Sequence, residues 1–201
     1  NAMKHWVKNF DIDGFRCDMA RTVPVDFWVE ARGECDAQKY LFWLAECEIL
    51  NYHEAFDLTY GWEVMRAFDK YFKDELKFDE IKPLLINYSH YPIGSRKLLF
   101  TSNHDENTYH GTEYEKYGAS AKALAVFSCT WPGIPLIYSG QEKPNYKRLE
   151  FFEKDFIDWS GDVELHGFYK TWLTIRKRNK ALHESASVLL LQTDVQNILA
   201  Y

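Results

Sequence analysis

The stretch D-I-D-G-F-R-C-D-M-A, residues 11–20, places three carboxylates and a guanidinium in a segment that otherwise has the pattern of a buried strand. Side chains alternate between the two faces of a strand, so Gly14, Arg16 and Asp18 share one face, and Phe15 and Cys17 share the other. The two earlier aspartates, Asp11 and Asp13, lie at the entry of the strand and are expected to be turn or solvent groups. A guanidinium one pleat away favours the carboxylate form of Asp18 and lowers its pKa. We therefore expect an ionised carboxylate at the end of this strand.

The composition predicts one globular domain with a sizeable core, because 46% of the 201 residues are hydrophobic. A net charge of −6 without a block of like charges argues against nucleic acid and an anionic membrane as partners. The sequence has no signal peptide and no apolar run long enough to cross a membrane, so a soluble protein is expected. No two of the four cysteines have the C-x-x-C spacing, and we expect buried free thiols.

Apolar runs alternate with segments of helical periodicity along most of the chain. This order predicts an α/β fold in which a parallel sheet is connected by helices. The tail, residues 187–201, has the pattern of two short strands. A closed eight-stranded barrel needs roughly 250 residues, more than this chain has. The expected strands of the main body are 12–17, 41–46, 55–60, 97–103 and 134–139.

Four of these five strands are followed directly by an acid or by an acid-containing turn. The acids are Asp18, Glu46, Asp105 and Glu142. Chemistry in parallel α/β sheets is located beyond the carboxyl ends of the strands, so these side chains are candidates for a site. Glu46 follows the apolar run L-F-W-L-A, where loss of hydration raises the pKa of a carboxyl, as a general acid requires. An ionised carboxylate paired with a protonated one is the machinery of glycoside hydrolysis.

Four segments together carry a resemblance to a known family. G-F-R-C-D (14–18), L-A-E (44–46), F-T-S-N-H-D (100–105) and G-I-P-L-I-Y-S-G-Q-E (133–142) resemble the motifs of strands four, five, seven and eight in α-amylase family glycoside hydrolases, of the neopullulanase and cyclomaltodextrinase kind. They occur in the family's order and cover most of the chain. The helical segment 167–182 also resembles the last barrel helix of the family. The resemblance implies a partial (β/α)8 TIM barrel, about strands four to eight.

The resemblance implies roles for individual residues in retaining cleavage of α-glucosidic bonds in starch-like or maltodextrin substrates. Asp18 would be the nucleophile, Glu46 the general acid and base, and Asp105 the group that holds sugar hydroxyls and stabilises the transition state. The carboxyls of Asp18 and Glu46 would then lie roughly 5–5.5 Å apart. Further substrate contacts are expected from Arg16, Asn103, Tyr60, His104 and Tyr109.

The sequence also departs from the family pattern. Residues 19–22, M-A-R-T, stand where many members have a Lys-His pair that touches sugar, and the motif of strand three has no counterpart. Residues 1–185 are therefore expected to form the second half of a barrel, and residues 186–201 the beginning of a C-terminal β-domain. A half-barrel has open sheet edges, so we expect self-association and weak or absent activity.

Three alternatives bear on this hypothesis. The chain could be a non-catalytic carbohydrate-binding or interaction protein with an amylase-like fold. Glu48, two residues after Glu46, competes for the acid role. A metal-dependent barrel is the third, but the seven histidines are scattered and form no helical pair at ligand spacing. We accordingly expect no metal and no cofactor in this chain, although calcium is possible in a full-length parent.

Overall fold

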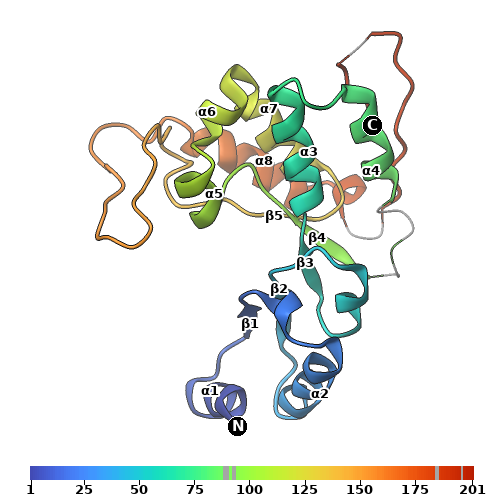
Figure 1. The fold of residues 1–201 in the computed structure, drawn as a ribbon, viewed down its shortest axis with the longest axis vertical. Coiled ribbons are helices and arrows are strands. Elements are labelled where there is room, and N and C mark those ends of the chain that lie inside the picture. Colours follow the sequence, from blue (N-terminus) through green and yellow to red (C-terminus); the bar gives the residue numbers. More distant parts are fainter. Residues whose placement is uncertain (88–90, 92–93, 184–185, 196) are drawn as a thin grey trace. The chain divides into compact units, whose positions relative to one another are not determined.

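The computed structural model describes residues 1–87, 91, 94–183, 186–195 and 197–201. Within these ranges the fold is α/β, and five strands form one sheet in the order β1-β2-β3-β4-β5 (Figure 1). The pairs β1–β2, β2–β3 and β3–β4 are parallel, as the alternation of strands and helices predicts. The strands are β1 Gly14–Cys17, β2 Phe42–Ala45, β3 Leu58–Tyr60, β4 Arg96–Leu99 and β5 Ile134–Pro135.

Eight α-helices lie in the described ranges, and short 3-10 turns join several of them. The α-helices are α1 Ala2–Phe10, α2 Val25–Asp36, α3 Trp62–Phe72, α4 Ile81–Asn87, α5 His104–Tyr109, α6 Glu113–Tyr117, α7 Ala121–Thr130 and α8 His166–Arg178. The 3-10 turns are η1 Ala20–Thr22, η2 Leu50–Glu54, η3 Phe78–Glu80, η5 Gly118–Ser120 and η6 Lys180–Leu182. No helix in the described part of the chain is long and apolar enough to span a bilayer.

Each expected strand is present but shorter than its apolar run. β4 stops at Leu99 instead of residue 103, because the chain turns there into the start of α5. β5 has two residues, since Pro135 has no N–H to donate. In the described part of the tail, the two expected strands are reduced to an antiparallel bridge between Leu191 and Ala200. The domain boundary expected at 185 lies outside the described residues.

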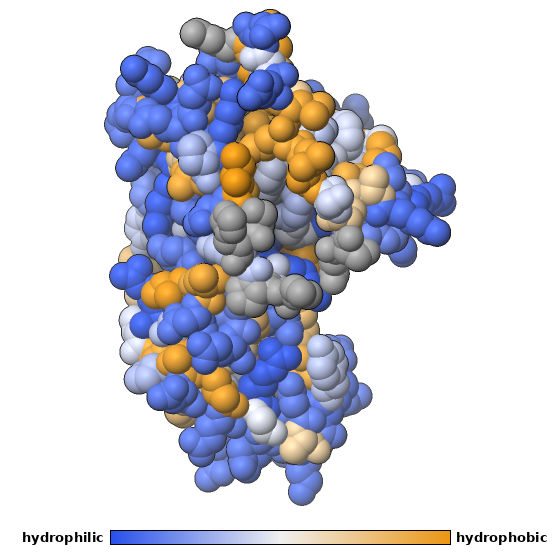
Figure 2. Space-filling view, turned by 90° about the vertical axis from the view of Figure 1, so that its right-hand side faces the viewer, coloured by the Kyte–Doolittle hydropathy of each residue, from blue (hydrophilic) through white to orange (hydrophobic). Residues whose placement is uncertain are grey.

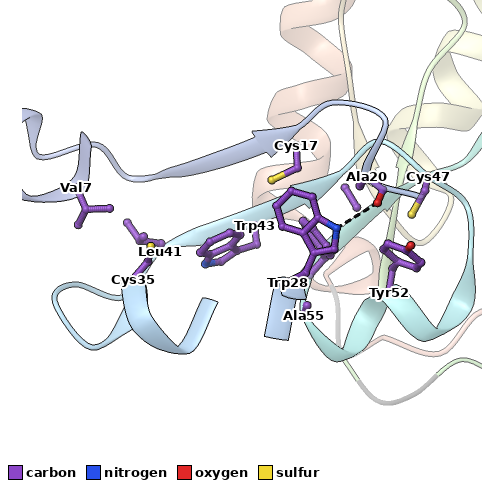
Figure 3. Packing of buried hydrophobic residues seen from close by; sticks show 12 residues of the cluster. Val7, Cys17, Ala20, Trp28, Cys35, Leu41, Trp43, Cys47, Tyr52 and Ala55 are labelled. Atoms are coloured by element: carbon purple, nitrogen blue, oxygen red, sulfur yellow. Dashed lines mark hydrogen bonds between the residues drawn. The ribbon is translucent and has the colours of Figure 1, made fainter. Parts of the chain in front are cut away.

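The chain divides into two compact units, residues 1–62 with 88–98, and residues 63–87 with 99–201. Each has its own packed interior. In the first, the core gathers around Trp43 of β2, which is fully buried (Figure 3). Trp28 of α2 lies in the same cluster and donates its indole N–H to the carbonyl of Ala20 at 3.1 Å. The face of β2 that carries Trp43 and Ala45 is therefore buried in this cluster.

Two carboxylates of the first unit hold Trp43 in place. Asp57 accepts from the Trp43 backbone N–H at 2.8 Å, and Asp36 accepts from the indole Nε1 at 2.9 Å. Arg32 joins both acids, donating to Asp57 at 2.8 Å and to Asp36 at 3.1 Å. Because these groups have low exposure, the fully paired network fixes the position of β2 against α2.

The second unit packs α7 against α8. Arg176 of α8 donates to the carbonyls of Cys129 and Trp131 at 2.9 and 3.3 Å, at the C-terminal end of α7. A cation is favourable there, because the last carbonyls of a helix lack partners within it and form the negative end of its dipole.

On the face presented in Figure 2, most residues are hydrophilic and the apolar ones gather in patches. All four cysteines are free and buried, as expected.

Gly14 lies at a close approach of β1 to β2. A Cβ built on it would lie 2.1 Å from the carbonyl oxygen of Phe42, too close for any side chain. We predict that Gly14→Ala lowers the free energy of unfolding by about 3 kcal/mol, at the upper end of overpacking costs. Urea unfolding followed by tryptophan fluorescence measures this difference.

Gly33 provides the matched control, because it is an exposed interior position of α2 where a new Cβ meets nothing within 4 Å. Gly33→Ala should stabilise the protein by about 0.5–1 kcal/mol, since alanine has the higher helix propensity. Equal stability of the two variants would contradict the close approach of β1 and β2.

Candidate active site

The register of β1 and β2 brings two of the predicted acids to one edge of the sheet. Gly14 is opposite Phe42 and Cys17 is opposite Ala45. The next backbone N–H, that of Glu46, donates to the carbonyl of Cys17 at 3.0 Å. Because parallel strands end together, the residues that follow both strands, Asp18 and Glu46, leave the sheet side by side.

Arg16 joins these two carboxylates. Its Nη1 is hydrogen-bonded to Asp18, and its Nη2 lies 3.0 Å from Glu46 Oε2. Its Nε donates to the hydroxyl of Tyr60 at 3.4 Å, and the guanidinium carbon is 5.8 Å from the Tyr60 ring centre. Burial by itself lowers the pKa of Arg16, but the bonds to Tyr60 and Asp18 raise it above its ordinary value. The shared face predicted for Arg16 and Asp18 is confirmed.

The two acids differ in their surroundings. The side chain of Glu46 is 10% exposed, whereas that of Asp18 is 73% exposed. Burial raises the pKa of Glu46, and the neighbouring Asp18 carboxyl raises it further. The hydrogen bond from the Met19 backbone and the charge of Arg16 act in the opposite direction without cancelling this effect. The raised pKa agrees with the direction expected for a carboxyl that follows an apolar strand.

Met19 is a contact that the sequence analysis missed. Its backbone N–H donates to Glu46 Oε2 at 2.8 Å. The residue has φ of 43°, in the left-handed region that non-glycine residues seldom occupy. Every residue except proline has a backbone N–H, so the pattern of side chains could not predict that the N–H of Met19 contacts Glu46. The turn after β1 thereby fixes the orientation of Glu46.

Glu48, the competing acid, has a different environment. The ammonium of Lys97, which is buried on β4, donates to the backbone carbonyl of Glu48 at 2.8 Å. Arg16 and Met19 both contact the Glu46 carboxylate. These two contacts support Glu46 as the acid, and the choice between Glu46 and Glu48 stays a prediction.

The remaining predicted residues belong to the second unit and gather on α5. Asn103 precedes the helix and is buried, and its Oδ1 accepts from the N–H groups of Asp105 and Glu106 at 3.0 and 2.8 Å. This is helix capping, which satisfies donors that have no partner within the helix. His104 Nε2 lies 3.4 Å from Asp105 Oδ2. Tyr109 closes the helix.

A buried carboxyl connects the segments that follow β4 and β5. Glu113 Oε2 accepts from the hydroxyl of Thr101 at 2.6 Å and from Gln141 Nε2 at 2.7 Å. Burial raises the pKa of Glu113, against the effect of these two donors. Gln141 also accepts from the backbone N–H of Tyr138 at 2.6 Å. Sequence analysis missed Glu113, because nothing in its local sequence identifies a partner 28 residues away.

The structure thus brings Arg16, Asp18, Glu46 and Tyr60 into contact within the first unit. The predicted residues from 103 to 109 lie together in the second unit. Their catalytic and binding roles stay predictions. Among the described residues, no group of three or more His, Cys, Asp or Glu side chains is arranged to hold a metal ion.

Comparisons with curated proteins identify relatives that are longer than this chain. An "Alpha-amylase 2" of Dictyoglomus thermophilum is 25% identical over 208 aligned positions, covering 94% of this chain and 37% of that protein. A cyclomaltodextrinase of Geobacillus thermopakistaniensis is 26% identical, with 98% of this chain and 35% of the relative covered. The chain therefore spans about a third of the length of these relatives. No family model matches it.

Solved structures show the same relation. The maltogenic α-amylase AmyB of Thermotoga neapolitana superposes with a TM-score of 0.80 at 30% identity, over 90% of this chain and 43% of its own. The α-amylase of Geobacillus thermoleovorans, solved in complex with acarbose, superposes with a TM-score of 0.74 at 25% identity, over 90% and 44%. The five-stranded parallel sheet thus matches part of amylase TIM-barrel structures. Which barrel strands it represents stays a prediction.

These likenesses relate the chain to glycoside hydrolases. Its homologues are members of the α-amylase family, cyclomaltodextrinases and maltogenic amylases among them, and the chain spans only part of their length. The family resemblance carried by the four motifs is confirmed.

The Arg16–Asp18–Glu46 contact predicts opposite responses of Glu46 to two substitutions. Asp18→Asn is expected to lower the pKa of Glu46, because the Asp18 carboxyl raises it. Arg16→Met is expected to raise the pKa of Glu46, because the cation stabilises its charged form. A carbon-detected NMR titration of the glutamate carboxyls measures both shifts.

Glu115 serves as an internal reference in this titration. Its pKa is lowered by Arg148, a contact within the second unit that neither substitution touches. The resonance of Glu115 should titrate at the same pH in all three proteins. Shifts of Glu46 in the same direction for both variants would contradict the geometry described above.

Proposed function

We propose that the chain carries the acid pair of a retaining α-glycoside hydrolase. The observation that supports this best is the pair of unlike carboxyls on one guanidinium: Arg16 contacts exposed Asp18 and buried Glu46, and the pKa of Glu46 is raised. An ionised carboxylate beside a carboxyl that retains its proton is what nucleophile and general acid require.

The reaction would proceed in two displacements. In the first, a carboxylate oxygen of Asp18 attacks the anomeric carbon while Glu46 protonates the leaving glycosidic oxygen, which gives a β-glycosyl ester. In the second, the Glu46 carboxylate takes a proton from water, the water oxygen attacks the same carbon, and the ester bond to Asp18 breaks. Two inversions retain the anomeric configuration. Glu46 ends the cycle protonated and Asp18 ionised.

The proposed substrates are α-glucans of the starch and maltodextrin type. The support is the relation to amylases, one of which was solved in complex with acarbose. By the same resemblance, Asp105 would hold sugar hydroxyls and stabilise the transition state, with His104, Asn103, Tyr60 and Tyr109 as further substrate contacts. Arg16 would orient the nucleophile.

We further propose which part of the relatives this chain represents. Residues 1–185 would correspond to strands four to eight of the barrel with their helices, and residues 186–201 to the beginning of a β-domain. A polypeptide of these 201 residues alone is expected to hydrolyse α-glucans weakly or not at all, because the relatives build much of their structure from positions without a counterpart here. Robust release of reducing sugar that is lost with Asp18→Asn would contradict this expectation.

Trapping tests the catalytic roles, because it needs only one turnover. A 5-fluoro-α-glucosyl fluoride should attach to Asp18, and peptide mass spectrometry locates the label. Asp18→Asn should abolish labelling. Glu46→Gln should still label, since fluoride leaves without an acid. Whatever turnover of unactivated maltooligosaccharide the parent chain shows should fall by about 10²–10⁴-fold in this variant.

Glu48→Gln is the matched control for Glu46→Gln, because it removes the rival carboxylate two residues away. It should label and turn over like the parent. A chain that binds maltooligosaccharide but never labels Asp18 would instead be the non-catalytic carbohydrate-binding protein. Loss of turnover in Glu48→Gln alone would move the acid role to that residue.

Self-association stays a prediction of the sequence. β1 and β5 are the outer strands of the described sheet, and an outer strand has backbone groups that can pair with another chain. Light scattering after size exclusion should therefore give a native mass of at least twice the chain mass. A mass equal to one chain over a tenfold range of protein concentration would contradict it.

A further inference from the structure

The second unit contains a cavity of about 620 Å³ that is lined by α3, α7, η3 and residues 197–201. Among the described residues that line it, half are aromatic and none is charged. The aromatic residues are Phe68, Tyr71, Phe72, Phe78, Phe127 and Tyr201. This volume is in the range of small-molecule sites, which are mostly apolar and aromatic. No residue of the predicted glycosidase site lines the cavity, so the proposed function leaves it unexplained.

Edge-to-face contacts hold the rings of the cavity in place. The ring centres of Tyr71 and Phe78 are 5.4 Å apart, with 65° between the planes. Those of Phe68 and Phe127 are also 5.4 Å apart, at 69°. Tyr201 meets Phe127 at 86°, with the centres 6.2 Å apart. Aromatic pairs prefer such arrangements, so packing within the protein fixes the walls of the cavity.

An acidic recess adjoins the cavity and shares three of its half-buried rings, those of Tyr71, Phe72 and Phe78. Its walls carry four carboxylates and one ammonium. The charged residues are Asp74, Glu75, Lys77, Asp79 and Glu80. Within the described ranges, the carboxylates of Asp74 and Glu75 have no hydrogen bond and no ion pair. Negative charge therefore borders the aromatic cavity without a matching cation.

One ring at this boundary already holds a cation of the chain itself. The ammonium of Lys82 lies 6.0 Å from the ring centre of Phe78, and it pairs with Asp79 at 3.0 Å. The negative face of an aromatic ring attracts a cation, and a carboxylate beside the ring adds to this attraction. The boundary between cavity and recess therefore has the chemistry that favours a positively charged group.

We propose that the cavity binds a small organic cation with an apolar body, of the alkylammonium class. The apolar body would occupy the uncharged cavity, and the cationic head would lie at the boundary, near Asp74 and Glu75. Groups of aromatic rings recognise quaternary ammonium ions in this way. A neutral molecule of the same shape would gain only the apolar contacts, and an anion would be repelled. Because the rings are held by one another, little ordering has to accompany binding.

Calorimetric titration of the full chain with three hexyl compounds tests the charge of the ligand. Hexyltrimethylammonium should bind about tenfold more tightly than hexanol, since its head is attracted by rings and carboxylates. Hexanesulfonate should bind more weakly than hexanol. Equal affinities for the three compounds would overturn the proposal, and so would absence of binding by the ammonium compound.

Tyr71→Leu tests the rings, because leucine is apolar and favourable in a helix but has no aromatic face. Its affinity for hexyltrimethylammonium should fall about fivefold, whereas its affinity for hexanol should stay within twofold of the parent. Tyr71→Phe is the matched control, because it keeps the ring, and it should bind both compounds as the parent does. Equal losses for both compounds in Tyr71→Leu would leave a merely apolar cavity and contradict the cation site.

The double variant Asp74→Asn with Glu75→Gln tests the carboxylates of the recess. Asp74 has φ of 60°, a left-handed conformation that asparagine also adopts readily, so this change should preserve the fold. The affinity for hexyltrimethylammonium should fall about fivefold, as expected for two exposed charge contacts. Glu153→Gln with Asp162→Asn removes as much charge from exposed positions outside the recess and should bind within twofold of the parent. An equal loss in this control would assign the effect to net charge and refute the site.

The acid pair of the first unit is the competing place for a cation. Binding that is lost in Asp18→Asn but retained in Tyr71→Leu would place the cation at that pair and overturn the proposal. The outcome is separate from that of the proposed function. Absence of fluoro-sugar label on Asp18 would overturn the hydrolase and leave the cation site intact.

Discussion

The site of the first unit depends on the close approach of β1 and β2. Gly14 has no side chain where one would meet the carbonyl of Phe42, so the two strands can pair in the register that places Cys17 opposite Ala45. The ladder then continues for one more bond, from the Glu46 N–H to the Cys17 carbonyl. A shift of the pairing by one residue would point Arg16 into the core and Phe15 away from it. The meeting of Asp18 and Glu46 is therefore a consequence of backbone pairing.

Once the strands are registered, electrostatics distinguishes the two acids. Arg16 contacts both carboxyls, and without this cation two neighbouring carboxylates would repel each other. The cation acts on both, so it does not by itself make them different. Burial makes the difference: Glu46 is enclosed by the end of an apolar strand and by the turn at Met19, whereas Asp18 faces water. One cation and two degrees of exposure are sufficient to give two neighbouring carboxyls different proton affinities.

Much of this was predictable from the sequence, because it depends on periods and neighbours. The two-residue period assigned Arg16 and Asp18 to one face, and the apolar run before Glu46 indicated its raised pKa. Strand lengths were overestimated, because an apolar run continues through residues whose backbone no longer pairs with the neighbouring strand. The contacts of Met19, Glu113 and Asn107 were not predictable, since a backbone donor has no signature and a partner far along the chain leaves none in the local pattern.

The second unit shows why such distant contacts matter for function. Its segments after β4 and β5 are ordered by buried polar side chains, with Asn103 capping α5, Glu113 bonding Gln141, and Asn107 holding the loop that follows. A buried polar group stabilises only when it is satisfied, so each of these bonds permits one arrangement and penalises the alternatives. Apolar packing tolerates small displacements, but a shared carboxyl or amide does not. Loops that have to hold several side chains in one arrangement are therefore better fixed by polar bonds beneath them than by a larger core.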